Sequence, residues 1–355
     1  MNSRIKNLQK NLGAGEAVLI FEPSDRFYFT GFRSSAGAVV ITWEKAVFLI
    51  DFRYYEKAKS TVFDADVVLA TDMYKQIKET LASRAVKTVF LETDSIDLAT
   101  YLKLKEVLDG VEISTDCKIQ QAIIKLRSIK DEQELANIKS AQSIIDKTFE
   151  YILHKIKPGK TEREIALDME FFARKNGGEG VAFDFIVVSG KNSSLPHGVP
   201  TDKAIEAGDF LTMDFGVKVG GYCCDMTRTV AVGNVSEKQR KVYETVLKVQ
   251  LLALEKIKAG EICRQIDAVA RDYINANGFE KCFGHGLGHS LGIDVHESPA
   301  FNTRDERPLE SGMVMTVEPG IYLENEFGVR IEDMVVVTEN GCENLTHSPK
   351  ELIII

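Results

Sequence analysis

The sequence predicts a two-domain protein of the α/β (α+β) class, in which a smaller α/β domain precedes a larger domain made of two related halves. Three observations lead to this fold class. The chain has 355 residues, which exceeds a typical domain and suits two. Apolar runs with the length of strands alternate with helical patterns up to about residue 123. After residue 124 one helical pattern occurs twice, and a hairpin with an acidic residue in each strand follows each copy.

In the first domain, residues 1–123, four apolar runs predict strands and two patterns predict helices. The expected strands are 17–21, 37–42, 46–51 and 87–92, and the expected helices are 73–84 and 96–108. A long helix is then expected to open at Ser128, with Asp131 as a capping partner, and to run to Ile156 before a Pro-Gly pair.

The second domain, residues 124–355, contains an internal duplication. Residues 156–177 align without a gap with residues 257–278, at an offset of 101 positions. Capping boxes are expected in both halves, and a glycine is expected to end each duplicated helix. The boxes are Thr161 with Glu164 and Ser236 with Gln239, and the glycines are Gly177 and Gly278.

Two pairs of acidic residues follow the duplicated helices. Asp214 and Asp225 lie symmetrically about a predicted turn at 219–221, and Glu318 and Glu332 about a predicted turn at 324–326. The members of each pair should therefore be near cross-strand neighbours with carboxylates on one face. A single acidic residue is best read as a solvated strand position. Two symmetric pairs flanked by apolar runs instead indicate four clustered carboxylates, whose natural counter-charge is a pair of divalent metal ions.

Composition narrows the functional class. The chain is 44% hydrophobic and 27% charged, which is typical of a soluble globular protein. A net charge of −9 and the absence of basic runs argue against nucleic-acid binding. No secretory signal and no membrane-length apolar stretch is apparent, and the six cysteines show neither metal-site nor disulfide spacing. We therefore expect a cytoplasmic protein.

Three of the six histidines lie in a glycine-rich segment, residues 283–299. His285 and His289 have the spacing of a helical zinc motif, but the glycines disfavour a helix and the expected glutamate is missing. Glycine instead allows the backbone to approach a buried site closely. His197 precedes the first acidic hairpin much as His296 precedes the second. We assign no role to the two remaining histidines.

Six motifs, taken in order, resemble the pita-bread metallopeptidases, which include methionine aminopeptidase, aminopeptidase P and prolidase (Xaa-Pro dipeptidase). The motifs are Pro-His-Gly with His197, MDFG with Asp214, DMTRT with Asp225, GHGLGH with His289, VEPG with Glu318 and VRIED with Glu332. The first domain, with GFRSSAG at residues 31–37, is similar to the N-terminal domain of the Xaa-Pro branch and of creatinase. The resemblance implies a creatinase-like domain at 1–123 and a duplicated pita-bread catalytic domain at 124–355, with an antiparallel sheet flanked by helices.

The resemblance also implies a five-residue ligand set for two divalent ions per chain. Asp214 would chelate one ion, His289 and Glu318 the other, and Asp225 and Glu332 would bridge them. Oxygen-rich ligation with one imidazole suits manganese in the first place, with cobalt, iron or zinc as alternatives. Creatinase lacks this set, so creatine hydrolysis is disfavoured.

The same resemblance implies hydrolysis of the bond between an N-terminal residue and proline in short peptides. Glu318 would act as general base, and His197 and His296 would stabilise the substrate carbonyl. His285 and Arg330 would line the proline side. Arg330 is expected either to bind a substrate carboxylate or to anchor ligands such as Glu332, and Thr227 to orient Asp225.

The motifs leave substrate length open, because Xaa-Pro dipeptidases and aminopeptidase P share them. Other aminopeptidase specificities on the same site remain an alternative. A binding module without catalysis is an alternative of a different class. Relatives are commonly homodimers, so a homodimer is expected, without nucleic-acid or membrane partners.

Overall fold

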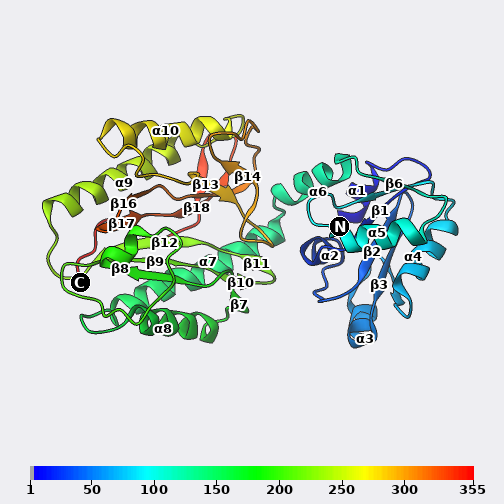
Figure 1. Ribbon diagram of the computed structural model, residues 1–355, viewed down its shortest axis with the longest axis horizontal. Helices are drawn as coiled ribbons and strands as arrows, with labels where there is room; N and C mark the ends of the chain where they lie inside the picture. Colours follow the sequence, from blue (N-terminus) through cyan, green and yellow to red (C-terminus); the bar gives the residue numbers. More distant parts are fainter. Residues whose placement is uncertain (1–3) are drawn as a thin grey trace. The chain divides into compact units, whose positions relative to one another are not determined.

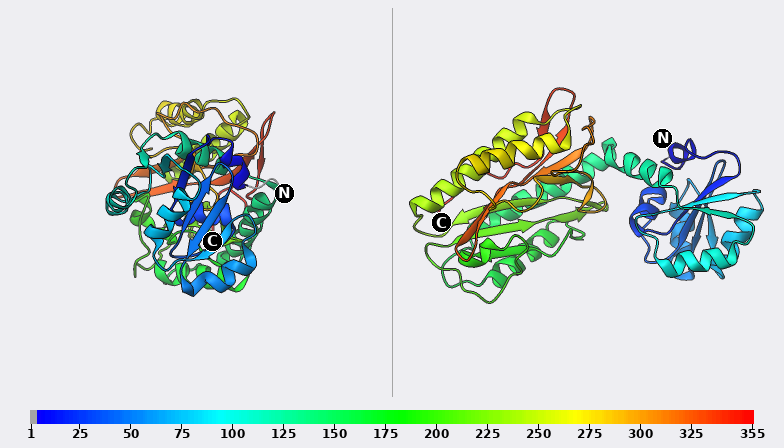
Figure 2. Two further views of the ribbon diagram at one scale, coloured as in Figure 1. Left: turned by 90° about the vertical axis from the view of Figure 1, so that its right-hand side faces the viewer. Right: turned by 45° about the horizontal axis from the view of Figure 1, so that its top comes forward.

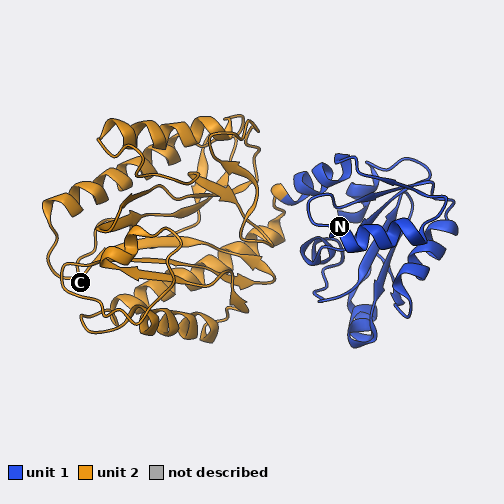
Figure 3. Ribbon diagram, viewed as in Figure 1, with its two compact units in different colours: residues 1–127 blue, residues 128–355 orange. Residues whose placement is uncertain are grey.

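The structure, a computed structural model, describes residues 4–355, and the chain folds into two compact units that divide between Arg127 and Ser128 (Figure 3). None of the helices in this described range combines the length and apolar composition needed to cross a membrane.

The first unit is a six-stranded mixed sheet in the order β4-β3-β2-β1-β5-β6 (Figure 1). Its strands are β1 Glu16–Ile20, β2 Ala38–Thr42, β3 Ala46–Ile50, β4 Asp66–Leu69, β5 Thr88–Leu91 and β6 Glu112–Ser114. Its helices are α1 Arg4–Gln9, α2 Pro23–Thr30, α3 Phe52–Thr61, α4 Met73–Ala82, α5 Leu98–Val107 and α6 Lys118–Ser128. Every residue of β2 and β3 is buried, as expected for central strands covered on both faces.

The prediction that the long helix opens at Ser128 is wrong. Ser128 is instead the last residue of α6, and α7 runs from Glu132 to Leu153. Asp131 is the N-cap of α7: its carboxylate accepts from the Glu134 amide, and the Glu134 side chain accepts from the Asp131 amide. The true capping box begins at the aspartate because its carboxylate satisfies an otherwise free amide of the first turn.

The second unit contains two helix pairs with strands between them (Figures 1 and 2). α7 and α8 (Glu162–Lys175) lie on one side of the strands, and α9 (Glu237–Lys256) and α10 (Cys263–Ala276) lie on the other. Capping boxes at Thr161 and Ser236 open α8 and α9, as predicted. Gly177 and Gly278 follow α8 and α10 with φ of 109° and 85°, which confirms them as helix-terminating glycines.

The strands between the helix pairs are antiparallel. The first half contributes β12-β9-β8 and the small sheet β11-β10-β7, and the second contributes β14-β13-β15-β18-β19 and the ribbon β16-β17. The bounds in the first half are β7 Gly180–Val181, β8 Ile186–Ser189, β9 Phe210–Phe215, β10 Val217–Val219, β11 Tyr222–Cys223 and β12 Met226–Ala231. Those in the second half are β13 Gly288–Ser290, β14 Glu297–Phe301, β15 Val314–Val317, β16 Gly320–Leu323, β17 Phe327–Arg330, β18 Asp333–Val337 and β19 Cys342–Asn344. A short 3-10 helix, η1, spans Gly190–Ser194.

The second acidic hairpin has the predicted register. Gly320 pairs with Arg330 and Leu323 with Phe327, so the hairpin is centred on Asn325, whose φ is 59°. Glu318 and Glu332 are equally far from Asn325 in the sequence, so they lie on opposite arms of the hairpin.

The first acidic hairpin is centred one residue later than predicted. Val219 pairs with Tyr222, and Asp214 pairs with Thr227 rather than with Asp225. The turn is formed by Gly220 and Gly221, both with positive φ, because a two-residue hairpin turn of this type needs left-handed backbone at both positions. The two aspartates are therefore diagonal rather than direct neighbours.

Candidate metal centre

The five predicted ligands lie together between the two halves of the second unit. Each sits in a central strand or at the residue adjoining one, where the backbone is fixed by the ladder. Asp214 is in β9, Asp225 directly precedes β12, His289 is in β13, Glu318 directly follows β15 and Glu332 directly precedes β18. The first half thus supplies two of these side chains and the second half supplies three.

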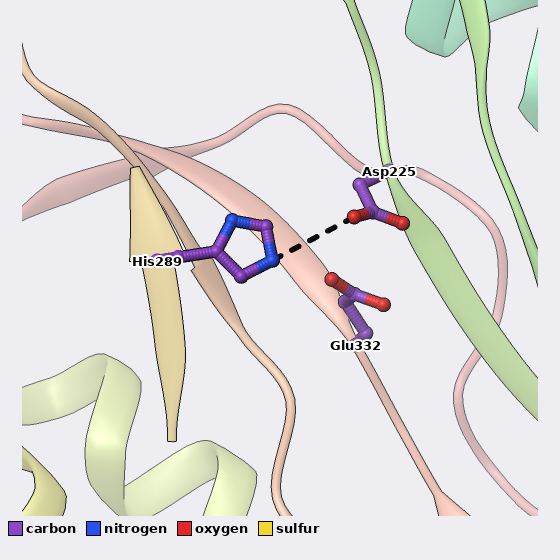
Figure 4. Close-up of side chains that lie close together, drawn as sticks. All are labelled: Asp225, His289 and Glu332. Carbon is purple, nitrogen blue, oxygen red and sulfur yellow. Dashed lines mark ion pairs between the residues drawn. The ribbon is translucent and has the colours of Figure 1, made fainter. Parts of the chain in front are cut away.

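Asp225, His289 and Glu332 face one another closely enough to hold one metal ion (Figure 4). Each offers one ligand atom, and these atoms lie within 4.8 Å of one another. Nε2 of His289 lies 3.8 Å from Oδ2 of Asp225 and 3.3 Å from Oε1 of Glu318. Nδ1 of His289 lies 3.1 Å from the Ser290 carbonyl oxygen. That contact fixes the proton on Nδ1 and leaves Nε2 as the ligand atom.

Three carboxylate oxygens in this cluster are buried without a hydrogen-bond partner among the described residues. They are Oδ1 of Asp214, Oδ1 of Asp225 and Oε1 of Glu332. An unpaired buried carboxylate oxygen is costly, and buried carboxylates are normally paired or bound to a metal. The donor set of four carboxylates and one imidazole therefore fits divalent metal ions, since it leaves free the oxygens that hard cations bind.

Burial and mutual repulsion make these carboxyl groups hard to ionise in the absence of a counter-charge. Burial raises the pKa of Asp225 well above its usual range, and the charges of Glu332 and Asp214 raise it further. Burial, then Glu318 and Asp214, raise the pKa of Glu332 in the same way. Burial also raises the pKa of Asp214, although the neighbouring Arg330 opposes the shift. A bound cation would reverse these shifts by stabilising the charged forms.

Arg330 donates hydrogen bonds to protein groups from all three of its guanidinium nitrogens. Its Nη2 donates to Oδ2 of Asp214 at 2.6 Å, and its Nε donates to the Thr227 hydroxyl at 3.0 Å. Its Nη1 donates to the carbonyl of Pro196 and to the hydroxyl of Tyr322. Arg330 is only 4% exposed, so of the two predicted roles its contacts match the anchoring of a ligand.

Thr227 contacts a different ligand from the one predicted. Its hydroxyl donates to Oε2 of Glu332 at 2.7 Å, whereas its expected partner was Asp225. The reason is the register: Thr227 pairs with Asp214 on one side, and its carbonyl accepts from the Glu332 amide on the other. Thr227 thus connects the two halves of the unit at the cluster.

Tyr322 is a site residue that the sequence reasoning missed. Its hydroxyl lies 2.9 Å from Nε2 of His285 and accepts from Arg330. Side chains alternate between the two faces of a strand, so Arg330 is expected on the same face as Glu332, and Tyr322 on the same face as Glu318. A signal for Tyr322 was therefore present in the sequence. Gly320 and Gly328 make room for the tyrosine, because a Cβ at either position would overlap its ring or hydroxyl.

A cavity of about 580 Å³ opens onto the cluster. All five predicted ligands line it, together with His197, His285, His296 and Arg330. The His296 ring packs edge-on against His289 with centroids 4.5 Å apart. The remaining wall is largely apolar and includes Phe183, Phe185, Ile186, Val295 and Phe301. The predicted catalytic and substrate-side residues therefore share one cavity, whereas His154 and His347 do not line it.

Buried carboxylates hold the loops that carry the histidines. Glu162, fully buried at the start of α8, accepts from the amides of Ser189 and Thr201 and from the side chain of Asn192. These contacts fix both ends of the loop with His197. In the other half, Asp267 of α10 accepts from the amide of Leu287 and pairs with Arg271, which donates to the carbonyls of Phe283 and His285. Each duplicated helix thus fixes a loop that carries one of the cavity histidines, His197 in the first half and His285 in the second.

Comparisons with known proteins identify the family of both units. Residues 136–339 match the model of metallopeptidase family M24, and residues 4–129 match the creatinase/prolidase N-terminal domain. The chain is 36% identical to the Xaa-Pro dipeptidase of Pyrococcus horikoshii, over 99% of both chains.

Solved structures give the same result. The Xaa-Pro dipeptidase from Bacillus anthracis superposes with a TM-score of 0.95 at 40% identity, covering 99% of both chains. The X-Pro aminopeptidase from Thermotoga maritima superposes with a TM-score of 0.90 at 37% identity, covering 98% of this chain and 99% of that one. With the first domain matched as well as the second, the chain belongs to metallopeptidase family M24 and carries a creatinase/prolidase N-terminal domain.

Proposed function

We propose that this protein is a metal-dependent peptidase that cleaves the bond between an N-terminal residue and proline in short peptides, with its catalytic domain at 124–355 and an accessory domain at 1–123. The observation that carries this proposal is the set of buried carboxylate oxygens that have no hydrogen-bond partner within residues 4–355 and lie beside an open cavity. The similarity to an Xaa-Pro dipeptidase and to an X-Pro aminopeptidase supports the proline specificity.

Five residues would hold two divalent ions, with manganese as the first candidate. Asp214 would bind one ion, His289 and Glu318 the other, and Asp225 and Glu332 would bridge them. Four carboxylates balance the four positive charges, and the imidazole is neutral. When bound, such ions polarise the scissile carbonyl and lower the pKa of a coordinated water.

The remaining steps belong to side chains around the cavity. Glu318 would take a proton from the attacking water; its position at the cavity wall beside His289 supports this role. His197 and His296 would donate hydrogen bonds to the carbonyl oxygen as negative charge develops there. A proline nitrogen has no N–H, so this site needs no acceptor for one. The apolar wall gives the proline ring a dry surface.

The contacts of Arg330 favour activity on peptides longer than two residues over activity limited to dipeptides. Among the described residues that line the cavity it is the one lysine or arginine, and its donors already bind Asp214, Thr227, Tyr322 and Pro196. It therefore does not offer a free fork to the terminal carboxylate of a dipeptide. His285 would bound the proline side through its contact with Tyr322.

A metal-reconstituted assay with Ala-Pro, Ala-Pro-Ala and Met-Ala-Ser tests the proposal. We expect hydrolysis of Ala-Pro-Ala at a rate comparable to that of Ala-Pro, and none of Met-Ala-Ser. Cleavage of the methionyl peptide alone would overturn the proline specificity. Absence of hydrolysis with Mn, Co, Fe and Zn would favour a binding module without catalysis.

Two further features of the protein remain proposals. A homodimer rests on the family resemblance, and sedimentation of the purified chain tests it. A reducing, cytoplasmic location is supported by the lack of a disulfide at any of the six cysteines, all of which lie in the described residues, and fractionation of the native cell tests it.

A further inference from the structure

A group of buried and half-buried polar and charged side chains lies directly behind the proposed metal ligands, and the proposed mechanism gives it no role. We call it the Arg228 cluster, and it consists of Arg228, Gln250, Asp333, Asn344 and Lys350. Arg228 is 1% exposed and Asp333 is fully buried. Arg228 lies three residues after Asp225, and Asp333 directly follows Glu332. The cluster therefore adjoins both proposed bridging ligands along the chain.

All five N–H groups of the Arg228 guanidinium have an acceptor. Nη1 donates to the backbone carbonyls of Thr227 and Glu332. Nη2 donates to Oδ1 of Asp333 at 2.7 Å and to the Ser348 carbonyl at 2.8 Å. Nε donates to the Pro349 carbonyl at 3.0 Å. One side chain thus joins β12, the start of β18 and the backbone of Ser348 and Pro349.

The second carboxylate oxygen of Asp333 is equally well satisfied. It accepts from Gln250 at 2.8 Å, Asn344 at 2.9 Å and Lys350 at 2.6 Å. Lys350 also donates to Oε1 of Gln250. Buried ion pairs add little stability relative to apolar packing of the same volume. A fully satisfied buried network instead fixes the geometry of the groups it joins.

The network fixes the contact between the two halves, which we call the seam. β12 belongs to the first half and residues 330–333 to the second, and they meet where the Glu332 amide donates to the Thr227 carbonyl at 3.0 Å. Arg228 donates to the carbonyls of these same two residues. Asp225 lies on one side of this seam and Glu332 on the other, so the separation of their carboxylates depends on how the seam is held.

We propose that Arg228, held by Asp333 and by the segment 348–350, is a positioning residue that sets the spacing of Asp225 and Glu332 and thereby the affinity of the dinuclear site. This inference rests on the proposed function.

The test uses the full-length protein stripped of metal. Arg228→Lys keeps the charge and loses the five-donor fork. We expect Mn²⁺ titrated by calorimetry to bind this variant about 10- to 100-fold more weakly at one of the two sites, the range typical for lost outer contacts of metal ligands. The visible absorption of the Co²⁺ form should change, and kcat should fall with KM within about twofold. Lys350→Met, which leaves the Arg228 pair intact, should shift metal affinity in the same direction by a smaller factor.

A matched control separates positioning from general destabilisation. Val246→Ala in the buried core on α9 should lower the melting temperature without changing metal affinity or the Co²⁺ spectrum. The inference would be overturned if folded Arg228→Lys and Lys350→Met both kept the Mn²⁺ affinity and the Co²⁺ spectrum of the wild type. It would also be overturned if Val246→Ala lost as much Mn²⁺ affinity as Arg228→Lys. If Arg228→Lys does not fold, Lys350→Met decides alone. If the wild-type chain binds no divalent ion, the proposed function itself is refuted. If the wild type binds and the variants bind equally well, only this inference is refuted.

Discussion

Replacing Thr227 by valine isolates one hydroxyl at the seam of the metal centre. Valine keeps the branched shape of threonine, so the change removes the hydroxyl and little else. Two interactions disappear: donation to Oε2 of Glu332 at 2.7 Å and acceptance from Nε of Arg330 at 3.0 Å. Both partners are charged groups, and each such hydrogen bond contributes about 1.5–3 kcal/mol.

Part of this loss should appear as weaker metal binding. Thr227 donation lowers the pKa of Glu332 against the burial that raises it, so without the hydroxyl the carboxylate ionises less readily. A loss of about 1.4–2.8 kcal/mol corresponds to a 10- to 100-fold weaker affinity. Calorimetric titration of the metal-free variant with Mn²⁺ measures it, together with kcat on Ala-Pro.

Two companion variants make the result specific. Thr227→Ser restores the hydroxyl and should recover most of the affinity. Thr212→Val removes a buried hydroxyl one strand away, whose partner is the neutral Thr229 hydroxyl at 3.0 Å. It should lower stability by about 1 kcal/mol and leave metal affinity unchanged. Mn²⁺ affinity of Thr227→Val within twofold of the wild type would refute the reasoning.

Three other substitutions test separate parts of the centre. Asp225→Asn should abolish dinuclear binding and activity. Because burial raises the pKa of Asp225, the metal-free wild type should lose stability as the pH rises above about 4. In the presence of a chelator, the melting temperature of the variant should therefore rise relative to that of the wild type between pH 5 and 8. Retention of two ions per chain would contradict the bridging role. Gly288→Ala would drive a Cβ into a backbone carbonyl of the neighbouring strand, so soluble yield and metal content should collapse, whereas Gly284→Ala, with open space around it, should behave as wild type. Glu162→Gln should lower kcat about tenfold by loosening the loop with His197, and loss of metal in this variant would show that the reasoning is wrong.

Sequence patterns predicted the site better than they predicted its surroundings. Chain symmetry about Asn325 gave the register of the second hairpin because that turn contains no irregularity. The first hairpin was misplaced by one residue because Gly220 and Gly221 alone form the turn, and the sequence offered three candidates. Hydrogen bonds between sequence-distant groups, such as Thr227 with Glu332, could not be predicted, since they depend on how two half-sheets meet.

The predicted start of the long helix was wrong because the sequence offers two residues that suit a helix start. Ser128 and Asp131 both satisfy the pattern of a helix start, and the structure uses only the aspartate. Glu162 and Asp267 were not singled out, because a buried carboxylate that accepts from loop amides reads in sequence as an ordinary helix-surface acid. Tyr322 was within reach of the alternation argument already applied to Arg330.

The division of the ligands between two halves has a consequence for synthesis on the ribosome. Asp214 and Asp225 leave the ribosome about a hundred residues before Glu332 does, an interval of roughly 5–20 s at ordinary elongation rates. During that interval the first half carries two acidic side chains whose eventual neighbours do not yet exist. The nascent first half therefore has no complete binding site with which to capture a wrong metal. Selection of the metal is postponed until nearly the whole chain has emerged.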